Sequence, residues 1–366
     1  MLTARAVDVR IIADDLTGAL DSAVAFATTH ASMDVKWRPD AKLHARLAVD
    51  VVSREGDEAN AIERHRAHSE WLAGGVVRFK KIDSLLRGHV AAETLACIAN
   101  TNFSRIVIAP AFPFQGRVTR GGRQVLLSTE TIVGHELQAE LARDIQVAIG
   151  RRDSALPKER CVIYDAETDD DLDHIVRSEW LNNPSTLWVG TGGLANALSR
   201  HLQLGATHHA DHKIVGPLVG LIGTHHDVTL LQLKAIRDND PQALITMGSD
   251  FSSSKSHLLH RMSQGQSSFV SVAVVGDRLA ITRQIRDAFS YLLDGMPLPG
   301  CFLVTGGETL RAVCDGMDAD RLAVEAAIEP GLPLSRIIGG TFSGVAILSK
   351  SGAFGDPQLF ARLLQG

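Results

Sequence analysis

An apolar stretch that ends in two adjacent aspartates and runs directly into a helix constrains the fold of this chain most. Residues 9–13 are rich in Val and Ile, which predicts a buried parallel strand. Asp14 and Asp15 follow, and apolar residues then recur at helical spacing from Leu16. In open parallel sheets, ligands bind where strands end and helices begin. Carboxylates in such a place need partners, so they predict a ligand site, although Asp15 would equally serve as a helix cap.

The first half of the sequence alternates between apolar runs of strand length and longer helical patterns. This alternation predicts an α/β fold, with a mostly parallel sheet flanked by helices. The expected strands are residues 7–13, 47–52, 76–80, 105–109, 161–164 and 186–189. The expected helices are residues 16–28, 59–72, 90–100, 136–149, 169–181 and 194–202.

A polar, His-bearing stretch at 205–212 interrupts this pattern. We place a domain boundary there, which predicts two α/β domains at residues 1–208 and 209–366, and the chain is long enough for both. The second, smaller domain is expected to end in Gly-rich β segments. Its expected strands are 218–222, 244–246, 269–274 and 302–304, and its expected helices are 228–237 and 278–293.

Charge and cysteine usage exclude several classes of protein. A net charge of −5 and a pI of about 6.3 argue against a nucleic-acid partner or an anionic membrane surface. No apolar run reaches the length of a membrane span, and charged residues interrupt the N-terminal apolar run, so no signal peptide is expected. The four cysteines show neither metal-ligand nor disulfide spacing, which predicts reduced thiols and a cytoplasmic location.

Three further polar loops follow predicted strands in the first half. An arginine binds a carboxylate or phosphate through two parallel hydrogen bonds, so the arginines in these loops predict an anionic substrate. Loops that follow parallel strands share one sheet edge, and we therefore expect them to converge. At helical spacing, Asp83 and Arg87 would equally form a structural salt bridge. The candidate substrate-binding residues are Ser53, Arg54, Lys81, Asp83, Ser84, Arg87, Gln115, Arg117 and Thr119.

The turn at residues 190–195 fits G-x-G-x-x-A after a predicted strand, a pattern typical of dinucleotide sites. An acidic residue at the end of the next strand should accompany that pattern, whereas Asp211 precedes the next strand. A tight strand-to-helix turn is therefore the preferred interpretation of these glycines.

Glycine-rich loops follow predicted strands in the second half as well. Glycines allow the backbone to approach a ligand closely, and helix N-termini favour anions. Together with one lysine, these loops predict a polyphosphate cradle, but no G-x-x-x-x-G-K-[ST] motif occurs. The candidate nucleotide-binding residues are Gly223, Thr224, Gly306, Gly307, Glu308, Thr309, Gly339, Gly340, Lys350, Ser351 and Gly352.

Taken together, these motifs resemble the four-carbon acid sugar kinase family over nearly the whole chain. The matching segments in the first half are A-D-D-L-T-G-A at 13–19, S-R at 53–54, K-x-D-S-x-L-R-G at 81–88 and P-A-F-P-x-Q-G-R-x-T at 110–119. Those in the second half are G-G-E-T at 306–309 and K-S-G-x-F-G at 350–355.

The resemblance implies ATP-dependent phosphorylation of a sugar acid such as threonate, erythronate or an oxo-tetronate. It also implies that domain 1–208 binds substrate and domain 209–366 binds nucleotide. The chemistry calls for Mg²⁺, whose ligands the sequence does not identify. Residues 223–226 read G-T-H-H, where the family usually has G-S-C-S, so nucleotide contacts around 224–260 and the choice of sugar acid stay open.

On this reading, the arginines hold the substrate carboxylate, with Arg87 as the first candidate and Arg54 or Arg117 as the second. Asp83 and Ser84 are expected to bind substrate hydroxyls.

Either Asp15 or Asp14 would accept the proton of the attacking hydroxyl. At a strand end the two should point in roughly opposite directions, and the helix N-terminus should favour the ionised form of Asp15. Alternatives are a sensor that binds a sugar acid or nucleotide without catalysis and an NAD-dependent dehydrogenase that uses the turn at 190–195. Whether the chain forms a homo-oligomer is left undecided.

Overall fold

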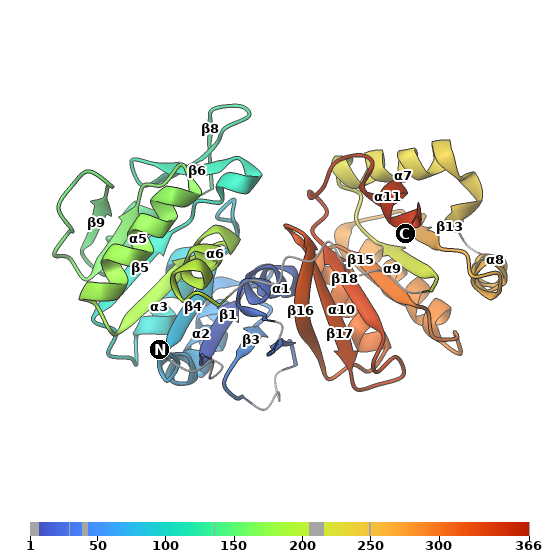
Figure 1. Ribbon diagram of the computed structural model, residues 1–366, viewed down its shortest axis with the longest axis horizontal. Coiled ribbons are helices and arrows are strands. Elements are labelled where there is room, and N and C mark those ends of the chain that lie inside the picture. Colours follow the sequence, from blue (N-terminus) through green and yellow to red (C-terminus); the bar gives the residue numbers. More distant parts are fainter. Residues whose placement is uncertain are drawn as a thin grey trace. The chain divides into compact units, whose positions relative to one another are not determined.

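The computed structural model describes residues 7–28, 30–38, 43–134, 136–204, 216–248 and 250–365 (Figure 1). The chain divides into two compact units, Met1–Ala206 and Thr207–Gly366. Both units are α/β, as the alternation of patterns predicts. The predicted boundary between residues 208 and 209 lies outside the described residues.

The first unit contains a parallel sheet in the order β2-β3-β1-β4-β11-β5-β10-β9. Its strands are short, apolar and mostly buried, as expected of strands covered on both faces. The bounds are β1 Val9–Ala13, β2 Met33–Lys36, β3 Leu47–Asp50, β4 Val77–Lys81, β5 Arg105–Ala109, β9 Val147–Gly150, β10 Cys161–Tyr164 and β11 Thr186–Gly190.

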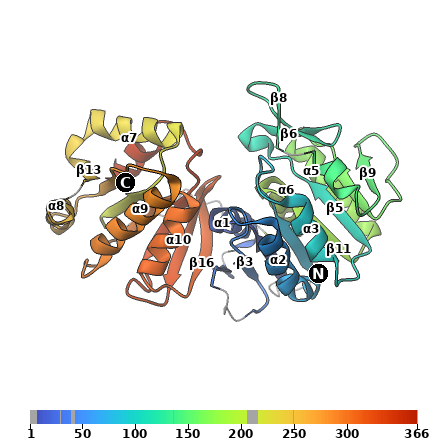
Figure 2. The same ribbon diagram turned by 180° about the vertical axis from the view of Figure 1, so that it is seen from behind.

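Helices cover both faces of this sheet. Figure 1 shows α5 and α6 in front of it, and Figure 2, from behind, shows α2 and α3 on the opposite face. The first helix, α1, ends earlier than expected and continues as a short 3-10 turn at Val24–Phe26. The bounds are α1 Leu16–Ala23, α2 Glu58–Ala73, α3 Val90–Ile98, α5 Asp169–Asn182 and α6 Gly192–His201.

The prediction of a helix at residues 136–149 is wrong over most of its length. Only α4, Leu137–Leu141, is helical, and β9 follows and pairs with β10 at the sheet edge. Ile145, Val147 and Ile149 alternate at the strand period and pack against the core, so pairing with β10 overrides the weaker helical pattern.

A second, antiparallel sheet of the first unit was not expected from the sequence. It consists of β6 Arg117–Arg120, β7 Arg123–Leu126 and β8 Thr131–Val133. The 3-10 turn Pro113–Gln115 precedes it, and Gly116 there adopts a φ of 65°, which favours glycine.

The second unit contains a sheet in the order β13-β14-β12-β15-β18-β17-β16, in which only the pairings of β17 are antiparallel. Its strands are β12 Leu218–Ile222, β13 Leu244–Met247, β14 Ser268–Val272, β15 Cys301–Thr305, β16 Arg321–Glu329, β17 Leu332–Ile338 and β18 Ala346–Lys350. The helices are α7 Asp227–Asn239, α8 Phe251–Ser263, α9 Arg278–Leu293, α10 Gly307–Gly316 and α11 Leu359–Gln365. The sequence indicated neither α8 nor α11.

Each sheet has one point at which the chain changes direction. In the first unit, β1 leads through α1 to β2 and β3, whereas β4 on its other side leads through α3 to β5. In the second unit, β12 leads through α7 to β13, whereas β15 leads through α10 towards β16. Ligands of such sheets bind outside the carboxyl ends of the strands at these points.

Among the described helices, none has the length and apolar character that crossing a membrane requires.

Candidate active site

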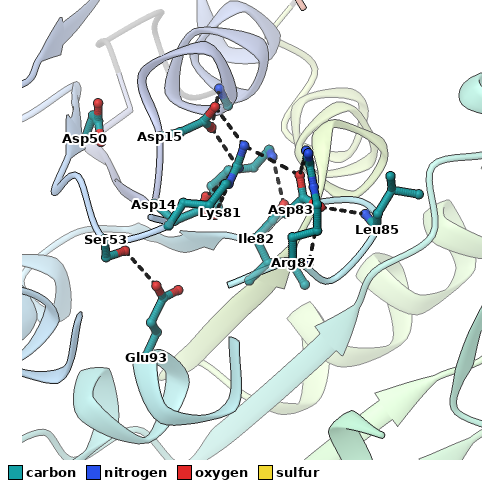
Figure 3. Close-up of polar contacts among 12 residues, drawn as sticks. Asp14, Asp15, Asp50, Ser53, Lys81, Ile82, Asp83, Leu85, Arg87 and Glu93 are labelled. Atoms are coloured by element: carbon teal, nitrogen blue, oxygen red, sulfur yellow. Dashed lines mark hydrogen bonds and ion pairs between the residues drawn. The ribbon is translucent and has the colours of Figure 1, made fainter. Parts of the chain in front are cut away.

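The loops that follow β1, β3 and β4 meet at the switch point of the first unit (Figure 3). The amides of Ser53 and Arg54 donate to the carbonyl of Asp14, at 3.1 and 3.3 Å. Asp15 is the N-cap of α1, and its carboxylate accepts a hydrogen bond from the amide of Gly18 at 2.9 Å. The expected convergence of these loops is therefore confirmed.

Arg54 binds both opening carboxylates. Its Nε and Nη2 donate to Asp14 at 2.7 and 3.0 Å, and its Nη2 and Nη1 lie 2.8 Å from the two oxygens of Asp15. The expectation that the two aspartates point apart is wrong, because two buried like charges share one counter-ion with several donors. The donors of Arg54 are thus used by protein carboxylates.

The two carboxyl groups differ in their electrostatics. Burial raises the pKa of Asp14, but Arg54 and two nearby lysines outweigh burial and hold it below its ordinary value. Burial lifts the pKa of Asp15 above its ordinary value despite Arg54, and the charge of Asp14 adds to the rise. The helix N-terminus therefore does not dominate at Asp15, contrary to expectation. A carboxylate with a raised pKa is the stronger base, which favours Asp15 as proton acceptor.

The Asp83 carboxylate accepts four hydrogen bonds from protein donors. Nε and Nη2 of Arg87 donate to it at 2.9 and 2.8 Å, and the amides of Leu85 and Arg87 donate at 3.0 and 3.2 Å. Burial raises the pKa of Asp83, but the Arg87 hydrogen bonds and the Arg54 charge hold it well below its usual range. The structural salt bridge between Asp83 and Arg87 is therefore formed, and Arg87 keeps 62% of its side chain exposed.

Two cations of the site, Lys81 and Arg117, have no carboxylate within ion-pair distance among the described residues. The buried ammonium of Lys81 lies beside Gly18 and donates to one main-chain carbonyl at 2.7 Å. Nη1 of Arg117 donates to the side chains of Ser84 and Gln115, whereas its Nε is buried without a partner. No carboxylate of the described residues therefore neutralises either cation by a direct ion pair.

A buried ionic cluster of Ser53, His65, Lys80 and Glu93 anchors the loop that carries Arg54. Ser53 Oγ donates to Glu93 at 2.6 Å, the Lys80 ammonium lies 2.8 Å from the other Glu93 oxygen, and His65 lies 3.7 Å from it. Ser53, expected to bind substrate, is instead fully buried and turned towards Glu93. A buried carboxylate needs donors, and Ser53 supplies one.

Lys80 and Glu93 are site-supporting residues that the sequence analysis missed. Burial lowers the pKa of Lys80 and raises that of Glu93, but their mutual attraction outweighs burial and keeps both charged. Glu93 is the one charged residue of α3, which is otherwise mostly apolar, and a charge in such a position is the signal that could have identified it. Lys80 carries no such signal, because its strand β4 also contains Arg78 and Lys81.

Thr119 does not face the site, contrary to expectation. It is fully buried inside the β6–β7 hairpin, and its hydroxyl donates to the side-chain oxygen of Gln124 at 3.1 Å. The amide of Gln124 in turn donates to the carbonyls of Ser84 and Pro110, at 3.1 and 3.0 Å. Gln124 therefore ties two site loops together, a role that nothing local in the sequence indicates.

Three Gly-rich loops of the second unit leave its sheet at the same level, because Ile222 pairs with Thr305 and Thr305 with Lys350. A Cβ on Gly223 would lie 2.2 Å from Thr309 Oγ1, and a Cβ on Gly352 would lie 2.7 Å from Thr224 Oγ1.

Gly306, with a φ of 97°, precedes α10, whose N-terminus has no side-chain cap. Gly307 and the exposed Glu308 form its first turn. First-turn amides without a side-chain cap and close backbone approach suit a polyphosphate, so this arrangement fits ATP.

Two parts of the expected cradle lie elsewhere. Gly339 and Gly340 belong to the turn between β17 and β18, where a Cβ on Gly340 would lie 2.0 Å from the Met317 carbonyl, beyond the C-terminus of α10. They are therefore at the opposite end of the strands, which is a correction. Glycine is required there because both have positive φ, and a Cβ would collide with the Asp320 side chain at Gly339 and with backbone atoms at Gly340.

Lys350 points into the protein rather than towards a ligand. Its ammonium donates to Thr229 Oγ1 and to the carbonyls of Ser351 and Phe354, at 3.3, 3.0 and 2.9 Å. Burial lowers its pKa to about 7. A direct phosphate contact by Lys350 would require these hydrogen bonds to break. Instead of the expected contact with nucleotide, Lys350 fixes the conformation of the loop that carries Ser351 and Gly352.

The glycine turn at 190–195 packs against protein atoms. Cβ atoms on Gly190 and Gly193 would each lie 2.7 Å from a main-chain carbonyl oxygen, and Thr191 caps α6. A tight turn explains these glycines, as the sequence analysis preferred.

No group of three or more His, Cys, Asp or Glu side chains that could hold a metal occurs within the described residues. Mg²⁺ in phosphoryl transfer usually needs only one or two carboxylates together with phosphate oxygens, so Mg²⁺ stays a prediction.

Comparison with known proteins yields two family models. A model described as a sugar-binding N-terminal domain matches residues 9–144, and one described as a nucleotide-binding C-terminal domain matches residues 219–360. The D-threonate kinase of Cupriavidus necator is 29% identical, covering 94% of this chain and 94% of its own. A 3-oxo-tetronate kinase of Pseudomonas savastanoi is 27% identical, covering 97% and 96%. A crystallised Haemophilus influenzae protein, 19% identical, shares the fold with a TM-score of 0.70 over 98% of this chain and 99% of that one.

Proposed function

The chain belongs to the four-carbon acid sugar kinase family, and on this premise we propose that it phosphorylates a hydroxyl of a four-carbon sugar acid with ATP. One observation carries the proposal. In the domain matched as sugar-binding, Lys81 and Arg117 have no carboxylate partner among the residues that the structure describes, and Lys81 lies beside the capping carboxylate of Asp15. An anionic substrate with hydroxyl groups satisfies both the cations and the carboxylate.

The site cations divide into two roles. We assign Lys81 and Arg117 to the substrate carboxylate, and Ser84, which already contacts Arg117, to a substrate hydroxyl. Arg54 and Arg87 instead hold the protein carboxylates in place.

Asp15 is assigned as the proton acceptor. It keeps more exposure than Asp14, at 21% against 2% of the side chain, and its pKa is the raised one of the pair. Phosphoryl transfer depends mostly on positioning and electrostatic stabilisation, and a base within reach of the attacking hydroxyl completes it. ATP supplies the phosphoryl group, and the amides near Gly223, Gly306 and Gly352 would hold its phosphates.

The test is ADP release with D-threonate, D-erythronate and 3-oxo-tetronate. D-threonate comes first, because the kinase of Cupriavidus necator bears that name. Activity with one of the three supports the proposal, whereas sugar-acid binding without ADP release would indicate a sensor. NAD-dependent oxidation of these acids would indicate a dehydrogenase.

A matched pair of variants tests the assignment of Arg117. Arg117→Gln is expected to reduce kcat/KM for the sugar acid by on the order of a hundredfold, since a charge-assisted pair is lost. Arg120→Gln, on the same strand but paired with Glu130 and Glu167 at the surface, should leave it unchanged. Equal activity of both variants would contradict the assignment.

A further inference from the structure

Asp21 is a carboxylate of the first unit that has no part in the proposed substrate binding or proton transfer. It lies in the last turn of α1, one and a half turns after the Asp15 cap. The side chain is partly buried, and among the described residues it has neither a hydrogen bond nor an ion pair. Largely buried polar groups normally have partners, so an unpaired carboxylate needs an explanation.

This position disfavours a carboxylate on two grounds. Burial raises the pKa of Asp21, so the ionised form destabilises the folded state at neutral pH. A negative charge in the last turn also opposes the helix dipole, and aspartate is a poor helix former. Residues that destabilise a fold without an internal partner are typical of functional sites.

The surroundings of Asp21 are those of the substrate site. Lys81, Arg117 and Asp15 all act on its carboxyl charge, although none lies within ion-pair distance. One turn earlier on the same helix, Thr17 has a buried hydroxyl without a partner. Asp21 therefore adds an acceptor to a group of side chains that have unused hydrogen-bonding capacity.

Gly192, in the turn at 190–195, packs against the Asp21 carboxylate. A Cβ on Gly192 would lie 2.8 Å from Asp21 Oδ2 and 3.0 Å from the ring of Phe112. Gly192 thus allows the carboxylate to sit against α6, with the aromatic ring beside it. The Gly-rich motif that first suggested a dinucleotide site therefore makes room for this side chain.

We propose that Asp21 is a specificity-determining residue that accepts a hydrogen bond from a hydroxyl group of the sugar acid. The inference rests on the proposed function and names the recognition element for one substrate hydroxyl. The carboxylate of Asp83 is already bound by Arg87 and two amides, whereas Asp21 has no such partner among the described residues. A site built around a carboxylate that only a hydroxyl can satisfy rejects analogues that lack the hydroxyl, since the charge is then left unpaired.

The first experiment compares Asp21→Ala with Asp21→Asn and with the control Ser22→Ala. Ser22 is the next residue of α1 and is fully buried, with an unpartnered hydroxyl that faces the core. Asp21→Ala should lower kcat/KM for the sugar acid roughly 10- to 100-fold, and Asp21→Asn less, because its amide oxygen still accepts a hydrogen bond. Ser22→Ala should be unchanged.

The melting temperature distinguishes recognition from a structural role. Asp21→Ala is expected to melt at or above the temperature of the wild type, because an unpaired, partly buried charge and a poor helix former are removed. Lower activity together with equal or higher stability supports the proposal. Lower stability with unchanged kinetics would assign Asp21 to the fold and overturn it.

The second experiment removes the hydroxyl from the substrate. Tetronates that lack one hydroxyl at C2, C3 or C4 are compared as substrates of wild type and Asp21→Ala. The analogue that lacks the reacting hydroxyl cannot be phosphorylated by either protein. Of the other two, the wild type should discriminate strongly against one, and Asp21→Ala should lose that discrimination, which identifies the hydroxyl. If the wild type is inactive with every sugar acid, the proposed function itself fails. If it is active but Asp21→Ala discriminates equally well, only the role of Asp21 fails.

Discussion

The two candidate ligand sites occupy equivalent places in two similar sheets, yet one consists mainly of charged side chains and the other mainly of glycines and main-chain amides. At the end of β1 and β4, charged side chains dominate, and Arg54 forms ion pairs with Asp14 and Asp83. At the end of β12 and β15, the site consists of glycines and main-chain amides, and its one buried lysine, Lys350, is turned inwards. The same topology thus presents side chains in one unit and backbone in the other.

This difference follows from what each site is proposed to bind. A small sugar acid has a carboxylate and several hydroxyls in fixed positions, so directional side chains are needed to recognise it. A polyphosphate offers many equivalent oxygens, which amides at a helix N-terminus bind without side chains. The site of the first unit depends on side chains that are held in fixed positions. The buried cluster around Glu93 anchors the loop that carries one of them, Arg54.

The largest expected effect concerns that cluster. Lys80→Met leaves Glu93 as a buried, unpaired charge and should lower the stability of the first unit by about 3–5 kcal/mol. Urea unfolding measures the loss, and ADP binding by the second unit serves as the internal control. Adding Glu93→Gln should restore part of the stability. A change below about 1 kcal/mol in the single variant would show that the cluster does not support the site.

Asp15→Asn tests the chemistry of the side-chain site. The amide keeps the size and much of the capping ability of Asp15 but loses its basicity, so turnover should fall on the order of a hundredfold, about 2.7 kcal/mol. The melting temperature and ADP binding should stay close to wild type. Asp14→Asn is the matched comparison, because both carboxylates bind Arg54. Should Asp14→Asn be folded and inactive while Asp15→Asn works, the two roles are exchanged.

Gly223→Ala tests the backbone site. The added Cβ would lie 2.2 Å from Thr309 Oγ1 and 3.0 Å from Ile285, so the loop must shift. We expect about tenfold weaker ADP binding by calorimetry, about 1.4 kcal/mol, with sugar-acid binding unaffected. Gly316→Ala is the control, because a Cβ there meets only ordinary contacts at the far end of α10. Unchanged ADP affinity in Gly223→Ala would place the nucleotide elsewhere.

The smallest effect is expected at Arg87. Arg87→Lys keeps the charge but loses the bidentate contact with Asp83, and such partly exposed pairs contribute little. The kcat/KM for the sugar acid should fall only about two- to fivefold. A loss well beyond tenfold, with the KM for ATP unchanged, would show that Arg87 contacts the substrate carboxylate, as the sequence first suggested.

The sequence by itself determined the α/β class, most strand and helix positions and the places where polar loops leave the strands. These depend on local hydrophobic period and on residues adjacent in the chain, such as the apolar run before Asp14. The same reasoning failed at residues 136–149, where pairing with β10 decided the outcome.

Only the tertiary structure decided which side chains of the loops are free. Ser53, Asp83 and Thr119 look like ligand-binding residues, but each is held by a side chain of another element or turn. Lys81 and Arg117, in contrast, have no carboxylate partner among the described residues. Asp21 escaped notice because a lone aspartate in a helix carries no local signal. A hydrogen-bond partner is chosen by distance in space, and residues 40 positions apart, such as Ser53 and Glu93, become neighbours only when the sheet has formed.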